Sequence, residues 1–238
     1  MKIAIMQPYF LPYIGYFSLI KHTDMFILLD TVQFIRHGWI ERNRVLKQNG
    51  GWIYIRVPLK KQSQDTLIID SKIDNSQNWK EKIFAQLQIY KKVAPNYFQT
   101  IELLEEIFSK EYESITKLNK AVLKTVSDYL EFDKDIYIFS EMNLQIEIPK
   151  EADEWALNIC KAIKSHKRIH YVNPIGGVEF FDRNKYIENG VDISFQKMKI
   201  TEYNQRRDNF EAGLSIIDVL MFNSKEEVIG MLDKYELI

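Results

Sequence analysis

Acidic, imidazole and guanidinium groups lie close together in one short stretch of the chain. Asp30 and His37 are groups that can act as a general base near neutral pH. Arg42 and Arg44 follow, and an arginine can hold a phosphate through two hydrogen bonds. Half of the eight arginines fall between residues 36 and 56, although lysine is three times as frequent. The stretch therefore predicts a site for a polar, anionic ligand. The alternative is a solvated loop with surface arginines.

An aromatic loop precedes this stretch. It begins at Gln7, directly after an apolar run at residues 2–6, and contains Tyr9, Tyr13, Gly15 and Tyr16. Ligands of open α/β sheets bind at the carboxyl ends of the strands. The tyrosines would stack on a ring, and Gly15 precedes a helix whose N-terminus favours phosphate. The loop lacks the glycine density of a nucleotide-binding fingerprint. Packing of a hydrophobic corner is the alternative interpretation.

Amides and glycines elsewhere extend the candidate site. Gln33 and Asn43 belong to the arginine stretch, and Gly176-Gly177 follows a short apolar run, where a tight turn is the alternative. Gln205 lies in a later polar segment.

Two further patterns have a structural explanation. Ser215 and Asp218 have the spacing of a helix cap, which explains them at least as well as catalysis. Cys160 is expected to be a small buried hydrophobe. The histidines have no metal-binding spacing, so no metal ligand is predicted.

Alternating strand and helix patterns must position these groups. Strands are expected at 2–6, 24–30, 52–57, 67–73, 135–139, 170–172 and 191–195. Helices are expected at 17–22, from 78 to about 130 with a break at Pro95, at 152–164 and at 225–235, and 214–222 is a further apolar segment. The pattern predicts an α/β protein with a Rossmann-like, mostly parallel sheet flanked by helices and a helical middle segment. Residues 1–75 would form an α/β ligand-binding part, 76–132 the helical segment, and 133–238 an α/β part completing one compact unit.

Composition narrows the class of protein. The 238 residues carry a net charge of −1 and a single cysteine, so a disulfide framework and a protein that coats nucleic acid are not expected. No stretch approaches the roughly 18 apolar residues of a membrane span, and the first residues lack the apolar region of a signal peptide. We therefore expect a cytoplasmic protein.

The N-terminal block resembles the WbqC-like family. Ala4-Ile-Met-Gln-Pro-Tyr-Phe-Leu-Pro-Tyr-Ile-Gly-Tyr-Phe17 carries the resemblance, and Val32-Gln33-Phe34, Trp39 with Arg42-Asn43, and Leu214 to Leu220 extend it. The resemblance implies a bacterial protein of surface-polysaccharide and O-antigen biosynthesis. It also implies an acyl or aminoacyl transferase acting on an amino sugar.

The implied substrate is a nucleotide-linked amino sugar, with no nucleic acid partner. Arg42 and Arg44 would bind its diphosphate, the loop tyrosines would stack on base or sugar, and Asp30 or His37 would accept a proton from the attacking amine. The donor stays open between acyl-CoA, an aminoacyl donor and ATP, and so do the sugar and the oligomeric state. A non-catalytic nucleotide-sugar-binding protein and an ATP-dependent amide-forming ligase are the alternatives. The ligase is suggested by a more distant resemblance to pantothenate synthetase and related nucleotidyltransferases, where Tyr13 and Tyr16 stand in the places of two phosphate-binding histidines.

Overall fold

A six-stranded sheet forms the centre of the fold. The computed structural model describes residues 1–238. The strand order is β5-β2-β1-β6-β7-β8, and all neighbours are parallel except β7 and β8. The strands are β1 (Lys2–Met6), β2 (Met25–Leu28), β5 (Ile136–Ile138), β6 (His170–Pro174), β7 (Asp192–Met198) and β8 (Tyr235–Leu237). The predicted α/β fold with a mostly parallel sheet is confirmed.

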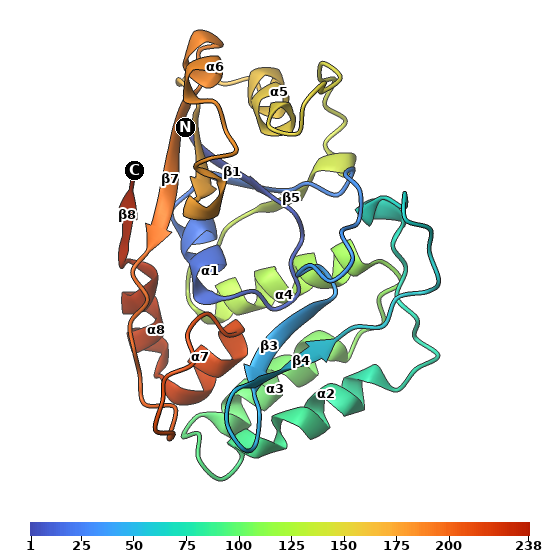
Figure 1. Ribbon diagram of the computed structural model, residues 1–238, viewed down its shortest axis with the longest axis vertical. Helices are drawn as coiled ribbons and strands as arrows, with labels where there is room; N and C mark the ends of the chain where they lie inside the picture. The colour runs from blue at the N-terminus through green and yellow to red at the C-terminus, as the bar shows by residue number, and fades with distance from the viewer.

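Helices cover both faces of this sheet (Figure 1). One face carries α1 (Ile14–Lys21), α4 (Ile115–Tyr129), α7 (Ile216–Phe222) and α8 (Lys225–Leu232), and the other carries α5 (Glu154–Ala162) and α6 (Arg183–Glu188). Ala4 belongs to the larger hydrophobic cluster, whereas Ile3 and Ile5 belong to the smaller one. Strand side chains alternate between faces, so a strand buried on both sides must be apolar throughout. That is the pattern that β1 shows.

A separate hairpin stands beside the main sheet. It consists of β3 (Arg42–Leu46) and β4 (Trp52–Arg56), and it packs with α2 (Trp79–Leu87) and α7. Helix α3 (Tyr97–Phe108) packs against α4 and α7. Four 3₁₀ turns complete the structure: η1 (Ile68–Asp70), η2 (Gln88–Tyr90), η3 (Phe139–Glu141) and η4 (Ile175–Gly177). Residues 30–132 thus lie outside the six-stranded sheet, and the next strand of that sheet is β5.

Several elements differ from the prediction. The strand expected at 67–73 is wrong, because residues 68–70 form η1 and contribute only isolated bridges on either side. The polar stretch 38–49 contains β3, which pairs with the predicted strand at 52–57. The final helix ends at Leu232, and β8 follows it. The predicted helices between residues 78 and 130 are confirmed as α2, α3 and α4.

Candidate ligand-binding cleft

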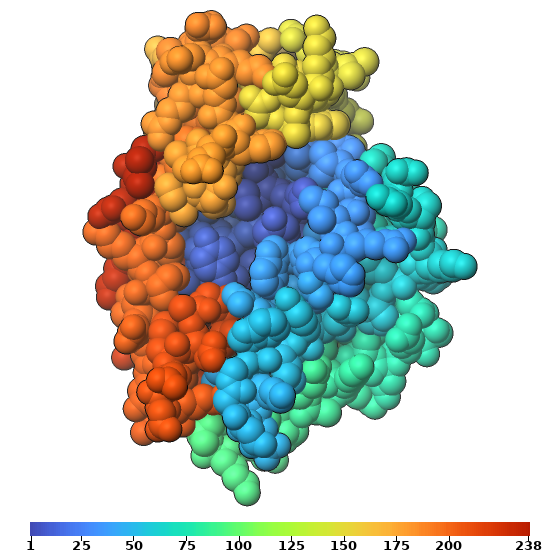
Figure 2. Space-filling view, in the orientation of Figure 1, coloured from blue at the N-terminus to red at the C-terminus, as the bar shows by residue number.

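A cleft opens where the strand order of the sheet changes direction. The chain passes from β1 to β2 and β5 on one side, and β6 and β7 lie on the other side of β1. Ligands of open α/β sheets bind at the carboxyl ends of the strands beside such a reversal. There the cleft has a volume of about 650 Å³. Figure 2 shows the hollow, with N-terminal residues at its base and residues of the C-terminal half above it.

The cleft is lined mainly by apolar and aromatic side chains. Its aromatic residues are Tyr9, Trp155, Tyr171, Phe180 and Phe181. The polar lining comes from the amides of Gln7 after β1, Gln33 after β2, and Asn173 on β6. Rings offer flat stacking surfaces, and amides donate and accept hydrogen bonds without adding charge. This lining suits a neutral ring that carries polar substituents.

A second cavity adjoins the cleft at Tyr9, which lines both. It has a volume of about 280 Å³, and Tyr13, Trp39, Asn43 and Arg44 are among its other lining residues. The cleft itself has no charged side chain in its lining, whereas this second cavity has the arginine. The two cavities together form a neutral compartment next to a cationic one.

Arg44 is held in place by two rings and a carbonyl group. Its guanidinium carbon lies 5.3 Å from the Trp39 ring centroid and 5.1 Å from that of Trp52, both cation–π distances. Its Nη2 donates to the Gly213 carbonyl at 3.1 Å, and its buried Nε has no partner. An unpaired buried donor costs free energy unless a ligand or water accepts from it. Arg44 is thus a fixed cation with donors to spare.

The loop between β1 and α1 is fastened by its carbonyl groups. Hydrogen-bond donors from other parts of the chain bind the carbonyl groups of Pro8, Phe10, Leu11 and Pro12. Nδ2 of Asn119 donates to Pro8 (2.8 Å), Nδ2 of Asn43 to Phe10 (3.0 Å), Oγ of Ser215 to Leu11 (2.8 Å) and the Ile216 amide to Pro12 (2.9 Å). Each of these carbonyl groups finds a specific partner, which fixes the backbone that presents Tyr9 and Tyr13.

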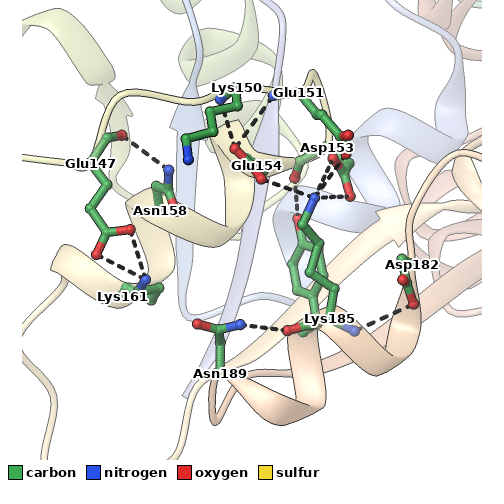
Figure 3. A network of polar contacts seen from close by, with 11 residues as sticks. Glu147, Lys150, Glu151, Asp153, Glu154, Asn158, Lys161, Asp182, Lys185 and Asn189 are labelled. Carbon is green, nitrogen blue, oxygen red and sulfur yellow. Dashed lines mark hydrogen bonds and ion pairs between the residues drawn. The ribbon is translucent and has the colours of Figure 1, made fainter.

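The opposite wall of the cleft comes from α5, and ion pairs hold that helix. The Lys185 ammonium on α6 contacts the Asp153 carboxylate at 3.1 Å and reaches Glu151 and Glu154 at the same distance (Figure 3). The Tyr186 hydroxyl donates to the Asp153 carbonyl at 2.7 Å. These contacts surround the N-terminus of α5, the end that brings Trp155 to the cleft.

The two predicted base residues lie outside both cavities. Asp30 is 1% exposed, and its carboxylate accepts from the Ser140 amide at 3.1 Å and the Ser140 hydroxyl at 2.7 Å. His37 is exposed, and its carbonyl group accepts a hydrogen bond from Arg42. Proton transfer by either residue stays a prediction. The structure gives Asp30 a local role, because it joins the end of β2 to η3.

Three predicted ligand-binding side chains lie in the interior. Tyr16 is 1% exposed, and its hydroxyl donates to the Gln7 carbonyl at 2.7 Å. Arg42 donates to backbone carbonyls of the 37–38 turn and lies 4.0 Å from the Tyr54 ring centroid. Gln205 donates to the Asp218 carboxylate at 2.8 Å. Their hydrogen bonds are made within the chain, and none of the three lines the cleft or the second cavity.

The predicted glycines also have local reasons. A Cβ on Gly15 would lie 2.5 Å from the Tyr13 ring, so a side chain of this chain occupies the approach expected for a ligand. A Cβ on Gly177 would lie 2.8 Å from Nδ2 of Asn173, which explains the glycine in that turn. Gly176 has open space around it. Neither glycine of the pair is among the residues that line the two cavities.

Burial affects the two tyrosines that remain at the site. It raises the pKa of Tyr9, with a further increase from nearby Tyr13, and it raises the pKa of Tyr13 itself. Both hydroxyls therefore stay protonated near neutral pH and can donate hydrogen bonds to a ligand.

Sequence reasoning missed Trp155 and Phe180 as lining residues and Asn119 as a support. A signal existed for Asn119, because it lies between Leu118 and Val122 on the apolar face of its helix, where an amide needs a partner. The aromatic residues gave no comparable signal, since rings at such positions are usually core.

The fold defines the class of this protein as an open α/β protein, with a cleft at a strand-order reversal. The chain belongs to the WbqC-like protein family, whose model matches residues 7–229. It is similar to the uncharacterized protein Rv1507c of Mycobacterium tuberculosis, with 25% identity over 224 residues that cover 93% of each chain. No solved structure matches it.

None of the helices has the length and apolar character needed to cross a membrane. No three or more His, Cys, Asp or Glu side chains gather in a way that would hold a metal ion.

Proposed function

We propose that this protein binds a nucleotide-linked amino sugar and serves the transfer of an acyl or aminoacyl group to its amine in surface-polysaccharide biosynthesis. The position of Tyr9, which lines both cavities, carries the proposal. The neutral cleft accepts a ring, and the adjoining cavity offers Arg44 to a phosphate. Family membership supports the biosynthetic setting.

The ligand would lie across Tyr9. Its diphosphate would accept hydrogen bonds from Arg44, which is already oriented by Trp39 and Trp52 and would lose little conformational entropy on binding. One ring, either base or sugar, would stack in the cleft against Phe180 or Trp155. The amides of Gln7 and Asn173 would bind its polar substituents.

Binding without catalysis is the second candidate, and one observation favours it. Amide formation requires a neutral amine, yet no carboxylate, imidazole or lysine lines the cleft. Its ionisable side chains are tyrosines with raised pKa, which are hydrogen-bond donors. In this version the protein would present the nucleotide sugar to a separate enzyme.

Calorimetric titration tests the binding mode. The ligands are uridine-, guanosine- and thymidine-diphosphate-linked amino sugars, together with the nucleoside diphosphates alone. Arg44→Gln should weaken binding of both kinds of ligand at least tenfold, since a charge-assisted contact is lost. Arg36→Gln is the matched control, because Arg36 is exposed and donates only to the Gln62 carbonyl. Equal affinities in the two variants would contradict the assignment of Arg44.

A second substitution identifies the ring in the cleft. Phe180 is 55% exposed, so Phe180→Ala should leave the fold intact. If the sugar lies in the cleft, this variant loses affinity for the nucleotide sugar and not for the nucleoside diphosphate. If the base lies there, it loses affinity for both. Unchanged affinity for both ligands would refute the assignment of the cleft.

Mass spectrometry separates the two candidates. The ligand found by titration is incubated with acyl-CoA, with an aminoacyl donor, or with ATP and a carboxylic acid. A mass increase on the amino sugar establishes transfer, and release of pyrophosphate from ATP establishes the ligase reaction. Tight binding with no product from any donor establishes the non-catalytic role.

A further inference from the structure

A groove lies at the turn end of the hairpin, and all of its charged lining residues are positive. It has a volume of about 590 Å³, and four of its twelve lining residues are cations: Lys91, Lys92, Arg206 and Arg207. None of the twelve is acidic, in a chain whose net charge is −1. None of the four cations takes part in an ion pair.

The cations approach the groove from two sides. Lys91 and Lys92 follow η2, and Arg206 and Arg207 lie in the segment between β7 and α7, more than a hundred residues away. Both segments meet the turn between β3 and β4 at the lower end of the molecule in Figure 1. Like charges brought together repel unless an anion lies between them. The fold therefore maintains a charge arrangement that an anionic ligand would stabilise.

The floor of the groove is rigid. Gln205 and Tyr90 line it, and both donate to the buried Asp218 carboxylate, at 2.8 Å and 2.7 Å. Arg207 donates to the carbonyl groups of Gly51 and Lys47, which orients its guanidinium. A phosphate-binding site benefits from such fixed donors, because less side-chain entropy is lost on binding.

We propose that this groove binds a ligand with at least two phosphate groups. One phosphate carries a charge of about −1.5 to −2 at neutral pH, so four cations match two phosphates. The only aromatic lining residue is Tyr90, which is fully buried, so the groove offers no surface on which a base could stack. Recognition then rests on the phosphates, whether they belong to a soluble diphosphate or to a lipid headgroup.

The test compares two lysine pairs by titration with inorganic pyrophosphate and orthophosphate. Lys91→Gln/Lys92→Gln removes two groove charges, and Lys60→Gln/Lys61→Gln removes two from another exposed pair. The arginines are left in place, because Arg207 also lowers the pKa of buried Asp218. We expect pyrophosphate to bind the wild type and the control equally and the groove variant at least tenfold more weakly. Orthophosphate should bind less tightly than pyrophosphate, and added salt should weaken both.

Vesicle sedimentation distinguishes the source of the phosphate. Vesicles of phosphatidylcholine with about 30% cardiolipin present anionic headgroups that each carry two phosphates. Retention of the wild type and the control, with loss of the groove variant, assigns the groove to a lipid headgroup. Pyrophosphate binding without vesicle retention assigns it to a soluble ligand. Equal behaviour of all three proteins in both assays would overturn the proposal.

Discussion

The hydroxyl of Tyr90 should contribute more to stability than any other tyrosine hydroxyl around Asp218. It donates to the Asp218 carboxylate at 2.7 Å and accepts from the Leu46 amide at 2.9 Å. All three residues are buried. Tyr90→Phe keeps the ring and its packing, so the perturbation is confined to these two hydrogen bonds.

The magnitude follows from the two bonds. A hydrogen bond to a charged group is worth about 1.5–3 kcal/mol, and a buried amide left without a partner costs about 1–3 kcal/mol. Tyr90→Phe should therefore lower the free energy of unfolding by about 4 kcal/mol. For a chain of this length that corresponds to a fall in melting temperature of roughly 8–16 °C. Tyr203→Phe breaks only one bond to Asp218, so its loss should be about 2 kcal/mol.

The loss should also depend on pH. Burial raises the pKa of Asp218, and the donors Tyr203, Tyr90 and Gln205 offset part of that increase. A raised carboxyl pKa means that the folded state holds its proton more tightly than the unfolded state. Stability from this group therefore falls as pH rises from the ordinary aspartate pKa through the folded one. Removing Tyr90's donor raises the folded pKa further, so its cost should be larger at pH 7.5 than at pH 4.

Urea denaturation followed by circular dichroism measures both effects. Tyr112→Phe is the control, because burial alone shifts the pKa of Tyr112 and no hydrogen bond contributes to it. Its free energy of unfolding should stay within about 0.5 kcal/mol of the wild type. A Tyr90→Phe loss below about 1 kcal/mol, or one equal to that of Tyr203→Phe, would refute the role given to the Leu46 amide. A loss independent of pH would refute the role given to the carboxylate.

Three further outcomes are expected. Gly15→Ala should displace the Tyr13 ring, since the new Cβ would lie 2.5 Å from it, and should cost about 1–3 kcal/mol; an unchanged melting temperature would contradict this. Asp30→Asn and Ser140→Ala should each lower the free energy of unfolding by about 1–2 kcal/mol, because both weaken the contact between Ser140 and the Asp30 carboxylate. If Asp30→Asn loses turnover and Ser140→Ala does not, Asp30 acts as a base instead. Burial raises the pKa of Cys160 to about 12, so its thiol should react with a disulfide reagent only after urea is added; rapid labelling of the native protein would contradict that burial.

The sequence predicts a strand or helix wherever its apolar residues repeat in a pattern that matches the buried surface. The continuous apolar run around Ile27 predicts a strand buried on both faces, and the apolar residues spaced around Val122 predict a helix buried on one face. The strand β3 was missed because its first three residues, from Arg42 to Arg44, are polar. In the folded chain Arg42 lies over the Tyr54 ring and donates to a backbone carbonyl group, and Arg44 lies over the Trp39 ring. These contacts cannot be read from the local sequence.

The site was predictable to the extent that topology places it. Strands β1 and β2 fix one side of the cleft, which is why three of the predicted residues, Gln7, Tyr9 and Gln33, line it. Asn119 and Ser215, which help to hold the loop after β1, lie more than a hundred positions from the carbonyl groups that they bind. A hydrogen bond over such a separation leaves no local pattern, so these supports emerge only from the structure.

The arginine stretch shows why residue type alone does not assign a role. Arg42 and Arg56 are direct cross-strand partners in the hairpin, an arrangement that repels unless each cation finds other contacts. Arg42 finds them in the 37–38 turn and on Tyr54. Arg44 keeps an unpaired donor because Gly213 takes only part of its guanidinium. The segment from Arg206 to Gly213 thus determines which hydrogen-bond donors of Arg44 stay unpaired. That one segment lines the proposed phosphate groove at its start and the Arg44 cavity at its end, so its conformation shapes both cavities.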